Sequence, residues 1–228
     1  MLSSISPESF LVYKAQKIVS GDFYMFEKRD QQSVIIMGDS TGHGVSASYI
    51  SLMILNILNR VLKFSFYCPA TVLEMLHLEI LSTTSLNNAN PIIECADMGM
   101  CFIDHEKMTM EYALARGKGI ILRDGKVIQL EREKCSVGAQ ECNEIKLKRN
   151  VINLLKGDQL YLYSDGITDQ FGGPFGKKIG NKKLLEILKS NSSFSMETQK
   201  NFILKELASW QGNYEQTDDI SLIGLKII

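Results

Sequence analysis

The chain has 228 residues, 45% of them hydrophobic and 22% charged, which is enough to bury one sizeable core, and we predict a single domain over residues 1–228. Its formal net charge is -1. A chain this close to neutral lacks the broad cationic surface that binds nucleic acid or anionic lipid without sequence preference, so no nucleic-acid partner is expected.

The cysteines are odd in number and form no C-x-x-C pair, which argues against a disulfide framework and against a zinc site. We expect all of them to be unpaired, buried side chains, as in a protein of the reducing cytoplasm. They are Cys68, Cys95, Cys101, Cys135 and Cys142.

Nothing in the sequence predicts a signal or a membrane span. The first 17 residues lack the basic start and apolar run of a secretory signal. The most apolar stretch, residues 49–58, is interrupted by Ser51 and Asn56 and is too short to cross a bilayer. We therefore expect no membrane segment in this chain and a cytoplasmic location.

The first third of the chain shows strand patterns followed by helix patterns. Residues 10–18 and 21–28 favour two adjacent strands, and the β-branched run 33–37 predicts a buried strand that ends at Gly38-Asp39. Apolar residues then recur at three- and four-residue spacing, which predicts one helix over 45–60 and a second from 69 to about 82.

The rest of the chain returns to strands before it ends in two helices and a strand. Short extended runs separated by turns such as Asp124-Gly125 predict an antiparallel sheet. This order describes an α+β layered domain and not a βαβ repeat. Strands are predicted over 98–104, 107–115, 119–124, 126–131, 158–164 and 220–228, and helices over 182–189 and 196–210.

Four acidic sites lie at strand ends or tight turns: Asp22, Asp39, Asp165 and Asp218. If they converged, each pair at ~4 Å would repel by about 4 kcal/mol at an effective dielectric near 20, and divalent cations would remove that conflict. An all-oxygen set favours magnesium, manganese or calcium over zinc. The alternative is that these residues, like Asp124, only form turns, because Asp before Gly is a common turn signal.

Four sequence blocks resemble the metal-dependent PPM-type phosphatases, in particular their bacterial sporulation-stage-II-E-like branch. The blocks are YKAQKIVSGDFYMF, GDSTGHGVSASYIS, GDQLYLYSDGITDQFGG and TDDISLIGLKI, in the order and approximate spacing of that family. The resemblance runs from Ser9 to the C-terminus. Residues 169–180 are similar to a subgroup whose members often carry sensory or membrane-bound regions before the phosphatase.

The resemblance implies an αββα sandwich of two antiparallel sheets flanked by helix pairs, with two cations, Mn²⁺ or Mg²⁺, at one edge. By motif position, Asp39 would bridge both cations, and Asp22 with the carbonyl of Ser40 would complete one. Asp165 and Asp218 would hold the other. Such a pair activates water for in-line attack on phosphorus, so Asp39 and Asp165 are the expected catalytic residues.

The residue that would bind phosphate is the least defined part of the resemblance. The eukaryotic branch uses an arginine near the first acidic motif, where this sequence offers only Lys14 and Lys17. Arg116 and Lys118 are further candidates, with ordinary surface charge as the alternative. His43 could act as a general acid, but its position favours a role in shaping the loop after Asp39.

The resemblance implies hydrolysis of phosphoserine or phosphothreonine on a bacterial regulatory partner, such as a STAS-type anti-sigma-factor antagonist. A homodimer is a further option. Two alternatives stay open at this point: a weakly catalytic, metal-binding module that acts by docking a partner, and a structural domain stabilised by calcium.

Overall fold

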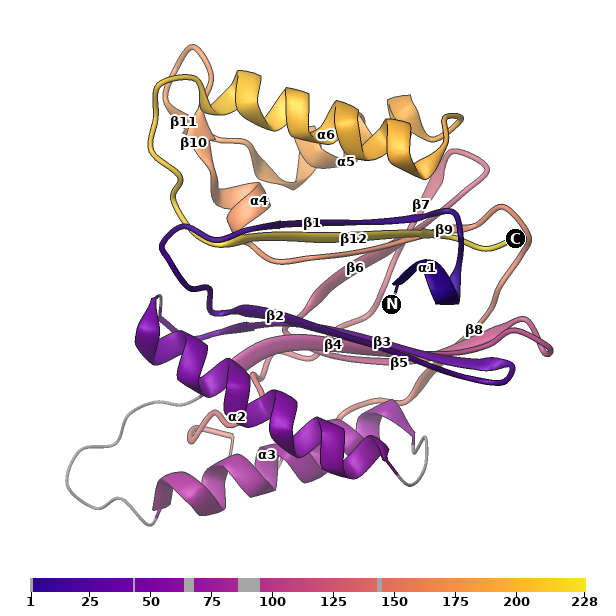
Figure 1. Ribbon diagram of the computed structural model, residues 1–228, viewed down its shortest axis with the longest axis vertical. Helices are drawn as coiled ribbons and strands as arrows, with labels where there is room; N and C mark the ends of the chain where they lie inside the picture. Colours follow the sequence, from indigo (N-terminus) through magenta and orange to yellow (C-terminus); the bar gives the residue numbers. More distant parts are fainter. Residues whose placement is uncertain (1, 43, 64–67, 86–94, 143–144) are drawn as a thin grey trace.

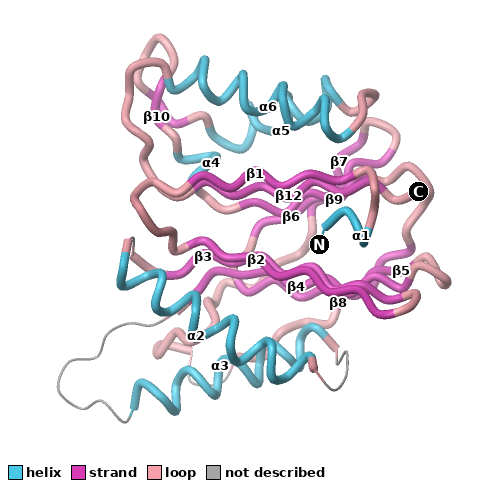
Figure 2. Tube along the Cα trace, viewed as in Figure 1, coloured by secondary structure: helices cyan, strands magenta, loops and turns pink. Residues whose placement is uncertain are grey.

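The computed structural model describes residues 2–42, 44–63, 68–85, 95–142 and 145–228. It consists of four layers, in which two antiparallel sheets are stacked and each outer face is covered by a helix pair (Figure 1). Figure 2 shows the same layering, with strands in the two middle layers and helices outside. The α+β sandwich expected from the sequence is confirmed.

Each sheet has five strands, and both contain segments from distant parts of the chain. The first sheet has the order β1-β12-β9-β6-β7, and the second has the order β2-β3-β4-β5-β8. The first comprises β1 (Ser9–Lys14), β12 (Ile220–Lys226), β9 (Gln159–Tyr163), β6 (Lys118–Arg123) and β7 (Lys126–Gln129). The second comprises β2 (Asp22–Arg29), β3 (Gln32–Ser40), β4 (Ala96–Asp104), β5 (Thr109–Ala115) and β8 (Asn150–Asn153).

Two pairings expected from the sequence differ in the structure. β1 and β2 are successive but do not pair, because β1 joins β12 in one sheet and β2 joins β3 in the other. The central run of strands also divides, since the chain crosses from β5 to β6 at Arg116-Gly117 and changes sheet there. A Cβ on Gly117 would lie 2.6 Å from the Met98 carbonyl carbon, so this tight crossing requires glycine.

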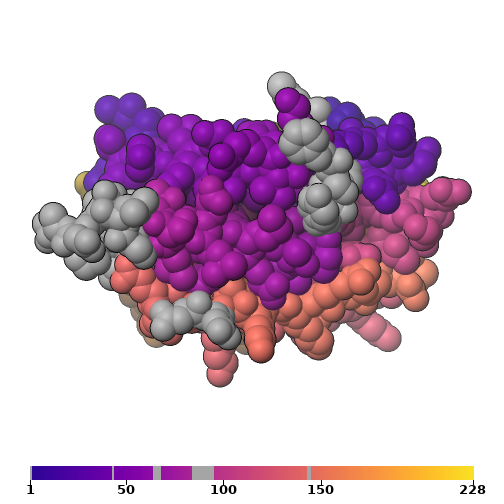
Figure 3. Space-filling model, turned by 90° about the horizontal axis from the view of Figure 1, so that it is seen from below, coloured from indigo at the N-terminus to yellow at the C-terminus, as the bar shows by residue number. Residues whose placement is uncertain are grey.

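The helix pairs cover the outer faces. α2 (Val45–Leu62) and α3 (Pro69–Ser85) pack on the second sheet, and Figure 3, seen from their side, shows them over the middle of that face. α5 (Gly180–Asn191) and α6 (Met196–Gln211) cover the first sheet. In α2 the buried residues recur every three or four positions, as the sequence pattern predicted.

α2 is longer than its most apolar stretch, which was predicted to be too short for a membrane. By length and composition alone it is the one helix in the described part of the chain that could cross a bilayer. However, its side chains at Ile50, Ile54, Leu58 and Leu62 are buried in the core cluster between the second sheet and the helices. This packing gives the apolar helix an ordinary role as a core element.

Several short elements had no signal in the sequence, because they are too short to show a period. α4 follows β9 directly, and a small hairpin occupies part of the segment after Asp169. These elements are α1 (Leu2–Ile5), β8, α4 (Gly166–Asp169), β10 (Phe171–Gly172) and β11 (Lys177–Lys178).

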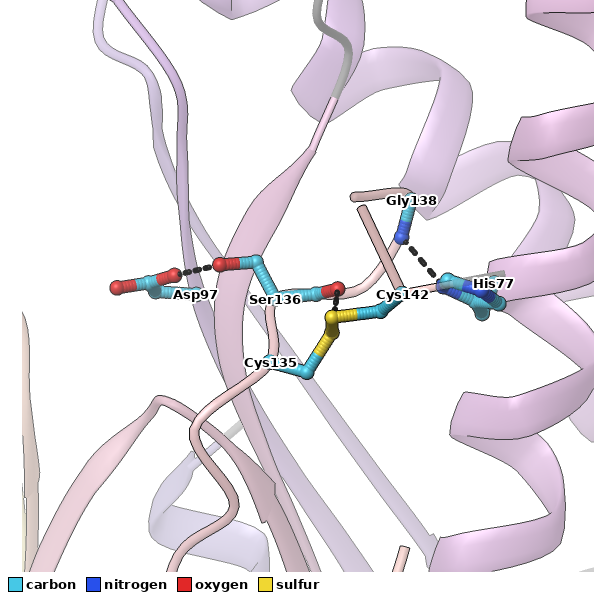
Figure 4. The surroundings of a disulfide bond; sticks show 6 residues. All are labelled: His77, Asp97, Cys135, Ser136, Gly138 and Cys142. Carbon is cyan, nitrogen blue, oxygen red and sulfur yellow. Dashed lines mark hydrogen bonds between the residues drawn. A yellow bond between two sulfur atoms is a disulfide. The ribbon is translucent and has the colours of Figure 1, made fainter. Parts of the chain in front are cut away.

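The prediction that all cysteines are unpaired is wrong for two of them. Cys135 and Cys142 form a disulfide that closes the loop after β7 (Figure 4). Cys95 and Cys101 are free and buried as expected, whereas Cys68 is free but only half-buried. The bond was missed because seven residues of separation carry no pairing signal, and cysteine usage therefore no longer argues for a reducing compartment.

We expect thiol titration of the unfolded, non-reduced protein to find three free thiols, and five after reduction. Because the bond closes a short loop, its loss in Cys135→Ser should lower the free energy of unfolding by about 2 kcal/mol. Urea unfolding with and without dithiothreitol measures this cost, and Cys68→Ser is the matched control. Five free thiols before reduction would contradict the bond.

Candidate metal centre

Three carboxylates lie in a row across one end of the second sheet. In the strand register Asp22 of β2 is opposite Asp39 of β3, and Asp39 is opposite Asp97 of β4. Residues paired in this way project to the same face of a sheet. Ile35 and Met37 have the same alternation as Asp39 and pack between the sheets, so the row faces the first sheet.

Asp22 begins β2 and is almost completely buried, with 2% of its surface exposed. Among the residues that the structure describes, neither of its carboxylate oxygens has a hydrogen-bond partner. Burial, together with the charges of Asp219 and Asp218, raises the pKa of Asp22 to about 7. A buried carboxylate in this state is costly unless a cation or a proton neutralises it.

Asp39 lies at the centre of the same cluster. Burial raises its pKa to about 10, and the charges of Asp22, Asp165 and Asp218 act in the same direction. Asp165 comes from the first sheet, between β9 and α4, and its Oδ1 is buried without a hydrogen-bond partner among the described residues. Carboxylates from both sheets therefore converge at one edge of the sandwich.

Asp218 and Asp219 precede β12 at the same edge and have different surroundings. Asp218 is half-buried, and its Oδ1 accepts a hydrogen bond from the Asp219 N–H at 2.8 Å. Asp219 is buried, and its two oxygens accept hydrogen bonds from the backbone N–H groups of Gln16 and Gly21, both at 2.7 Å. Asp219 thus holds the β1–β2 loop beside Asp22, whereas the charge of Asp218 raises the pKa values of Asp22 and Asp39.

The backbone around Ser40 brings its carbonyl into the same region. Ser40 ends β3 and is buried, and its Oγ is 2.9 Å from Ser51 Oγ of α2. The Ser40 N–H donates to the Gly21 carbonyl at 3.3 Å, and a Cβ on Gly21 would lie 3.2 Å from the Ser40 carbonyl oxygen. The Ser40 carbonyl therefore lies beside Gly21, the residue before Asp22, and its role as a cation ligand stays a prediction.

The donor set fits hard divalent cations. Asp22 and Asp165 have buried oxygens without partners among the described residues, and Asp39 has a raised pKa. A bound cation would stabilise the charged form of all three carboxylates. Among the described residues, no three His, Cys, Asp or Glu side chains already form a closed ligand group. We therefore expect cation binding to draw these carboxylates together.

The candidate phosphate-binding residues fall into two groups. Arg116 and Lys118 line a pocket with Asp39 and Asp165. Lys14 and Lys17 are exposed on the β1–β2 side and do not line that pocket. His43, the candidate general acid, lies outside the described residues.

Arg116 is held in place by an acidic partner at the centre. Its Nε is 3.3 Å from Oδ2 of Asp97, the third carboxylate of the row. The other Asp97 oxygen accepts a hydrogen bond from Ser136 in the loop closed by the disulfide (Figure 4). Arg116 itself has a left-handed backbone with φ 55°, which belongs to the crossing between the sheets.

Sequence reasoning missed the roles of Asp97 and Asp219. Nothing local marks Asp97, because its place beside Asp39 depends on the pairing of β3 with β4. Asp219 follows Asp218 in the block TDDISLIGLKI, and nothing in that block marks it as a hydrogen-bond acceptor for a distant loop. Its contacts with Gln16 and Gly21 join residues about 200 positions apart in the chain, so no sequence window contains both.

Comparisons with known proteins agree with this geometry. The family model described as Stage II sporulation protein E (SpoIIE) matches residues 29–228. The SiaA-PP2C domain of Pseudomonas aeruginosa superposes with a TM-score of 0.88 at 23% identity, covering 98% of this chain and 87% of that chain. Among curated proteins, none has a sequence that matches this chain.

Two further solved structures share the fold. The PP2C phosphatase domain of SpoIIE from Bacillus subtilis, solved with a fragment of its regulatory domain, has a TM-score of 0.76 at 18% identity, over 96% of this chain and 63% of that chain. RsbX in complex with magnesium has a TM-score of 0.68 at 15% identity, covering 95% of this chain and 92% of that chain. At these identities the likeness shows the fold.

Proposed function

The chain belongs to the SpoIIE family of PPM-type protein serine/threonine phosphatases, and we propose that it uses two divalent cations, Mn²⁺ or Mg²⁺, to hydrolyse phosphoserine or phosphothreonine on a regulatory partner protein. The observation that supports this most is the convergence of Asp22, Asp39, Asp165 and Asp218 from both sheets at one edge. The magnesium bound to RsbX is consistent with a hard cation here.

The proposed roles follow from the contacts of each side chain. Asp39 lies between Asp22 and the residues of the first sheet, which supports the proposal that it would contact both cations. Asp22 and the Ser40 carbonyl would complete one coordination shell, and Asp165 with Asp218 the other. When bound, the cations would orient the phosphate and lower the pKa of a water for in-line attack.

Arg116 is the residue that we propose for phosphate binding. It shares the pocket with Asp39 and Asp165, and among the described residues its guanidinium contacts only Asp97, which leaves further N–H donors for a phosphate. Guanidinium groups match phosphate geometry with two parallel N–H donors. Asp97 would thus position Arg116 and would not bind a cation itself.

We expect Arg116→Ala to raise KM for a phosphoserine peptide by about 10- to 100-fold, because a charge-assisted contact to phosphate contributes about 1.5–3 kcal/mol. Steady-state kinetics with Mn²⁺ measures this. Arg149→Ala is the matched control, because Arg149 pairs with Glu111 at a similar exposure, 57% against 55% for Arg116. An equal effect of the two variants would contradict the assignment.

Membership of the family supports a proposal for the class of partner. We propose a STAS-type or similar switch protein, whose phosphoserine the enzyme would hydrolyse to serine and inorganic phosphate in a signalling pathway. Mixing the enzyme with candidate phosphorylated switch proteins and following the phosphoprotein by mass spectrometry would identify the substrate.

The proposed function is tested by release of phosphate from a phosphoserine protein or peptide with Mn²⁺. Asp165→Asn should abolish turnover. Asp169→Asn should not, because Asp169 lies one helical turn later and pairs with Lys178 on the surface. No turnover by the wild type on any phosphoserine substrate, or equal activity in Asp165→Asn, would overturn the proposal.

A further inference from the structure

A second hollow, of about 370 Å³, opens beside the metal centre. It shares Asp97, Arg116, Lys118 and Asp165 with the phosphate pocket and extends from there over the segment that follows β7. Four cationic residues line it, and we call them the basic rim: Arg116, Lys118, Arg132 and Lys134.

The acidic residues of this hollow do not cancel the basic rim. Asp97 is already engaged by Arg116 and Ser136, and Asp165 belongs to the metal centre. Glu133 is then the one remaining carboxylate among the described lining residues. Lys118, Arg132 and Lys134 outnumber it, so the hollow is locally positive on a chain whose net charge is -1.

Backbone hydrogen bonds fix the rim beside the centre. The Arg116 N–H donates to the Glu133 carbonyl at 3.0 Å, and the Glu133 N–H donates to the Leu114 carbonyl at 2.9 Å. Arg132 Nη1 also donates to the Arg116 carbonyl at 3.1 Å. The segment that carries Arg132 and Lys134 is thereby attached to the end of β5, at the crossing that places Arg116.

Lys118 and Lys134 are available for an external anion. In the described parts of the chain, neither forms an ion pair, although both line the hollow. Lys134 is exposed and Lys118 is half-buried. Cations arranged along one wall of a catalytic cleft attract anionic groups that flank the reacting one.

We infer that the basic rim binds an acidic segment of the phosphoprotein substrate, next to the phosphoserine in the pocket. This inference rests on the proposed phosphatase function and specifies its substrate class. A phosphate held by Arg116 would place flanking residues of an extended peptide over Arg132 and Lys134, since each residue advances about 3.3 Å. Asp or Glu at these positions supplies the complementary charge.

The scale of the rim favours a short acidic peptide over nucleic acid. Proteins that bind nucleic acid strongly through the backbone make about 6–10 phosphate contacts. Here three cations remain beside Arg116, which matches a few carboxylates. Each exposed pair contributes modestly, so the expected preference for an acidic peptide over a neutral one is about tenfold.

The test compares two fluorescent phosphoserine peptides, one with Asp and Glu flanks and one with Ser and Gln flanks. Fluorescence anisotropy with Mn²⁺ should give about tenfold tighter binding of the acidic peptide, and the preference should fall at 0.5 M salt, where the Debye length is short. Lys134→Glu and Arg132→Glu should each reduce this preference at least threefold.

Lys126→Glu is the matched control. It makes the same charge change on an exposed lysine, in β7 at the far end of the β6–β7 hairpin, roughly 17 Å from Lys118 by strand rise. The preference should be unchanged in this variant. A similar loss in Lys126→Glu would show that net charge alone decides, and the basic rim would then have no special role.

Turnover separates this inference from the proposed function. Preferential binding of the acidic peptide without hydrolysis of either peptide would support the rim and overturn the phosphatase assignment. Hydrolysis of both peptides, together with equal affinity for the two, would support the phosphatase assignment and overturn the inference about the basic rim. Equally tight binding of a single-stranded DNA oligonucleotide would also overturn the assignment of the rim to a protein segment.

Discussion

Asp39→Asn is expected to abolish phosphatase activity and, at the same time, to stabilise the metal-free fold. Activity should fall by about 10³-fold or more, because the central carboxylate of the cation site is lost. The fold gains because Asp39 is a half-buried acid whose negative charge is opposed by desolvation and by the charges of Asp22, Asp165 and Asp218. We expect a gain of about 1–2 kcal/mol in the free energy of unfolding at neutral pH with EDTA present.

The pH dependence has a defined sign. The folded-state pKa of Asp39, about 10, and that of Asp22, about 7, lie above the usual value of 3.8. Below pH 4 both acids are protonated in the folded and unfolded states, so no penalty arises. As the pH rises from about 4 through these folded-state values, the unfolded state releases protons more readily, and the metal-free wild type loses stability.

Urea unfolding in EDTA between pH 4 and 8, and thermal shifts on adding Mn²⁺, measure both effects. Asp39→Asn should lose the thermal shift and flatten the pH profile. Asp124→Asn is the control, because it makes the same chemical substitution outside the acidic cluster, in the turn between β6 and β7, where Asp124 has φ 48°. If Asp39→Asn retained the full Mn²⁺ shift, its place at the centre of the site would be wrong.

Gly166→Ala should damage the same site through the backbone. A Cβ on Gly166 would lie 1.9 Å from the Asp219 carbonyl oxygen and 2.8 Å from the Asp219 carbonyl carbon. Gly166 begins α4 with an ordinary negative φ, so alanine would otherwise favour the helix. The clash must displace either Asp165 or the Asp218-Asp219 segment, and these supply the ligands of one proposed cation.

We expect Gly166→Ala to cost about 1–3 kcal/mol in stability, the usual range for overpacking, and to lower kcat/KM by about 100-fold. Isothermal titration with Mn²⁺ should show weaker binding. Gly125→Ala is the control, since it has φ 74° and no atom within 4 Å of the added Cβ. It should cost some stability but leave Mn²⁺ affinity intact, and wild-type affinity in Gly166→Ala would refute the argument.

The sequence predicted the parts of the fold that have a local signal. The three- and four-residue spacing of apolar side chains predicted α2, α3, α5 and α6. The acidic residues at strand ends indicated the edge of the sandwich where the candidate metal centre lies. Strand partners were not predictable, because the alternation of apolar and polar residues shows which side chains of a strand face the core but not which strand lies beside it. This is why β1 and β2 were wrongly taken as adjacent strands, and why β5 and β6 were expected in one sheet.

The site shows the same division. Asp22, Asp39, Asp165 and Asp218 could be selected by motif position, and the structure brings them together, while their binding of cations stays a prediction. Asp97 could not be selected, because only the register of β3 against β4 places it beside Asp39. Arg116 remained one candidate among several until the crossing between the sheets placed it in the pocket.

The β2–β3 hairpin has a consequence for how this sequence can vary. Its strands pair without interruption from Asp22 opposite Asp39 to Arg29 opposite Gln32, and the two-residue turn lies roughly 23 Å from the acids. Inserting or deleting one residue in that turn would slide one strand against the other and turn its side chains to the opposite face. This remote surface turn should therefore resist changes in length, and at Asp30, whose φ is 48°, it should accept Asn or Gly more readily than a β-branched residue.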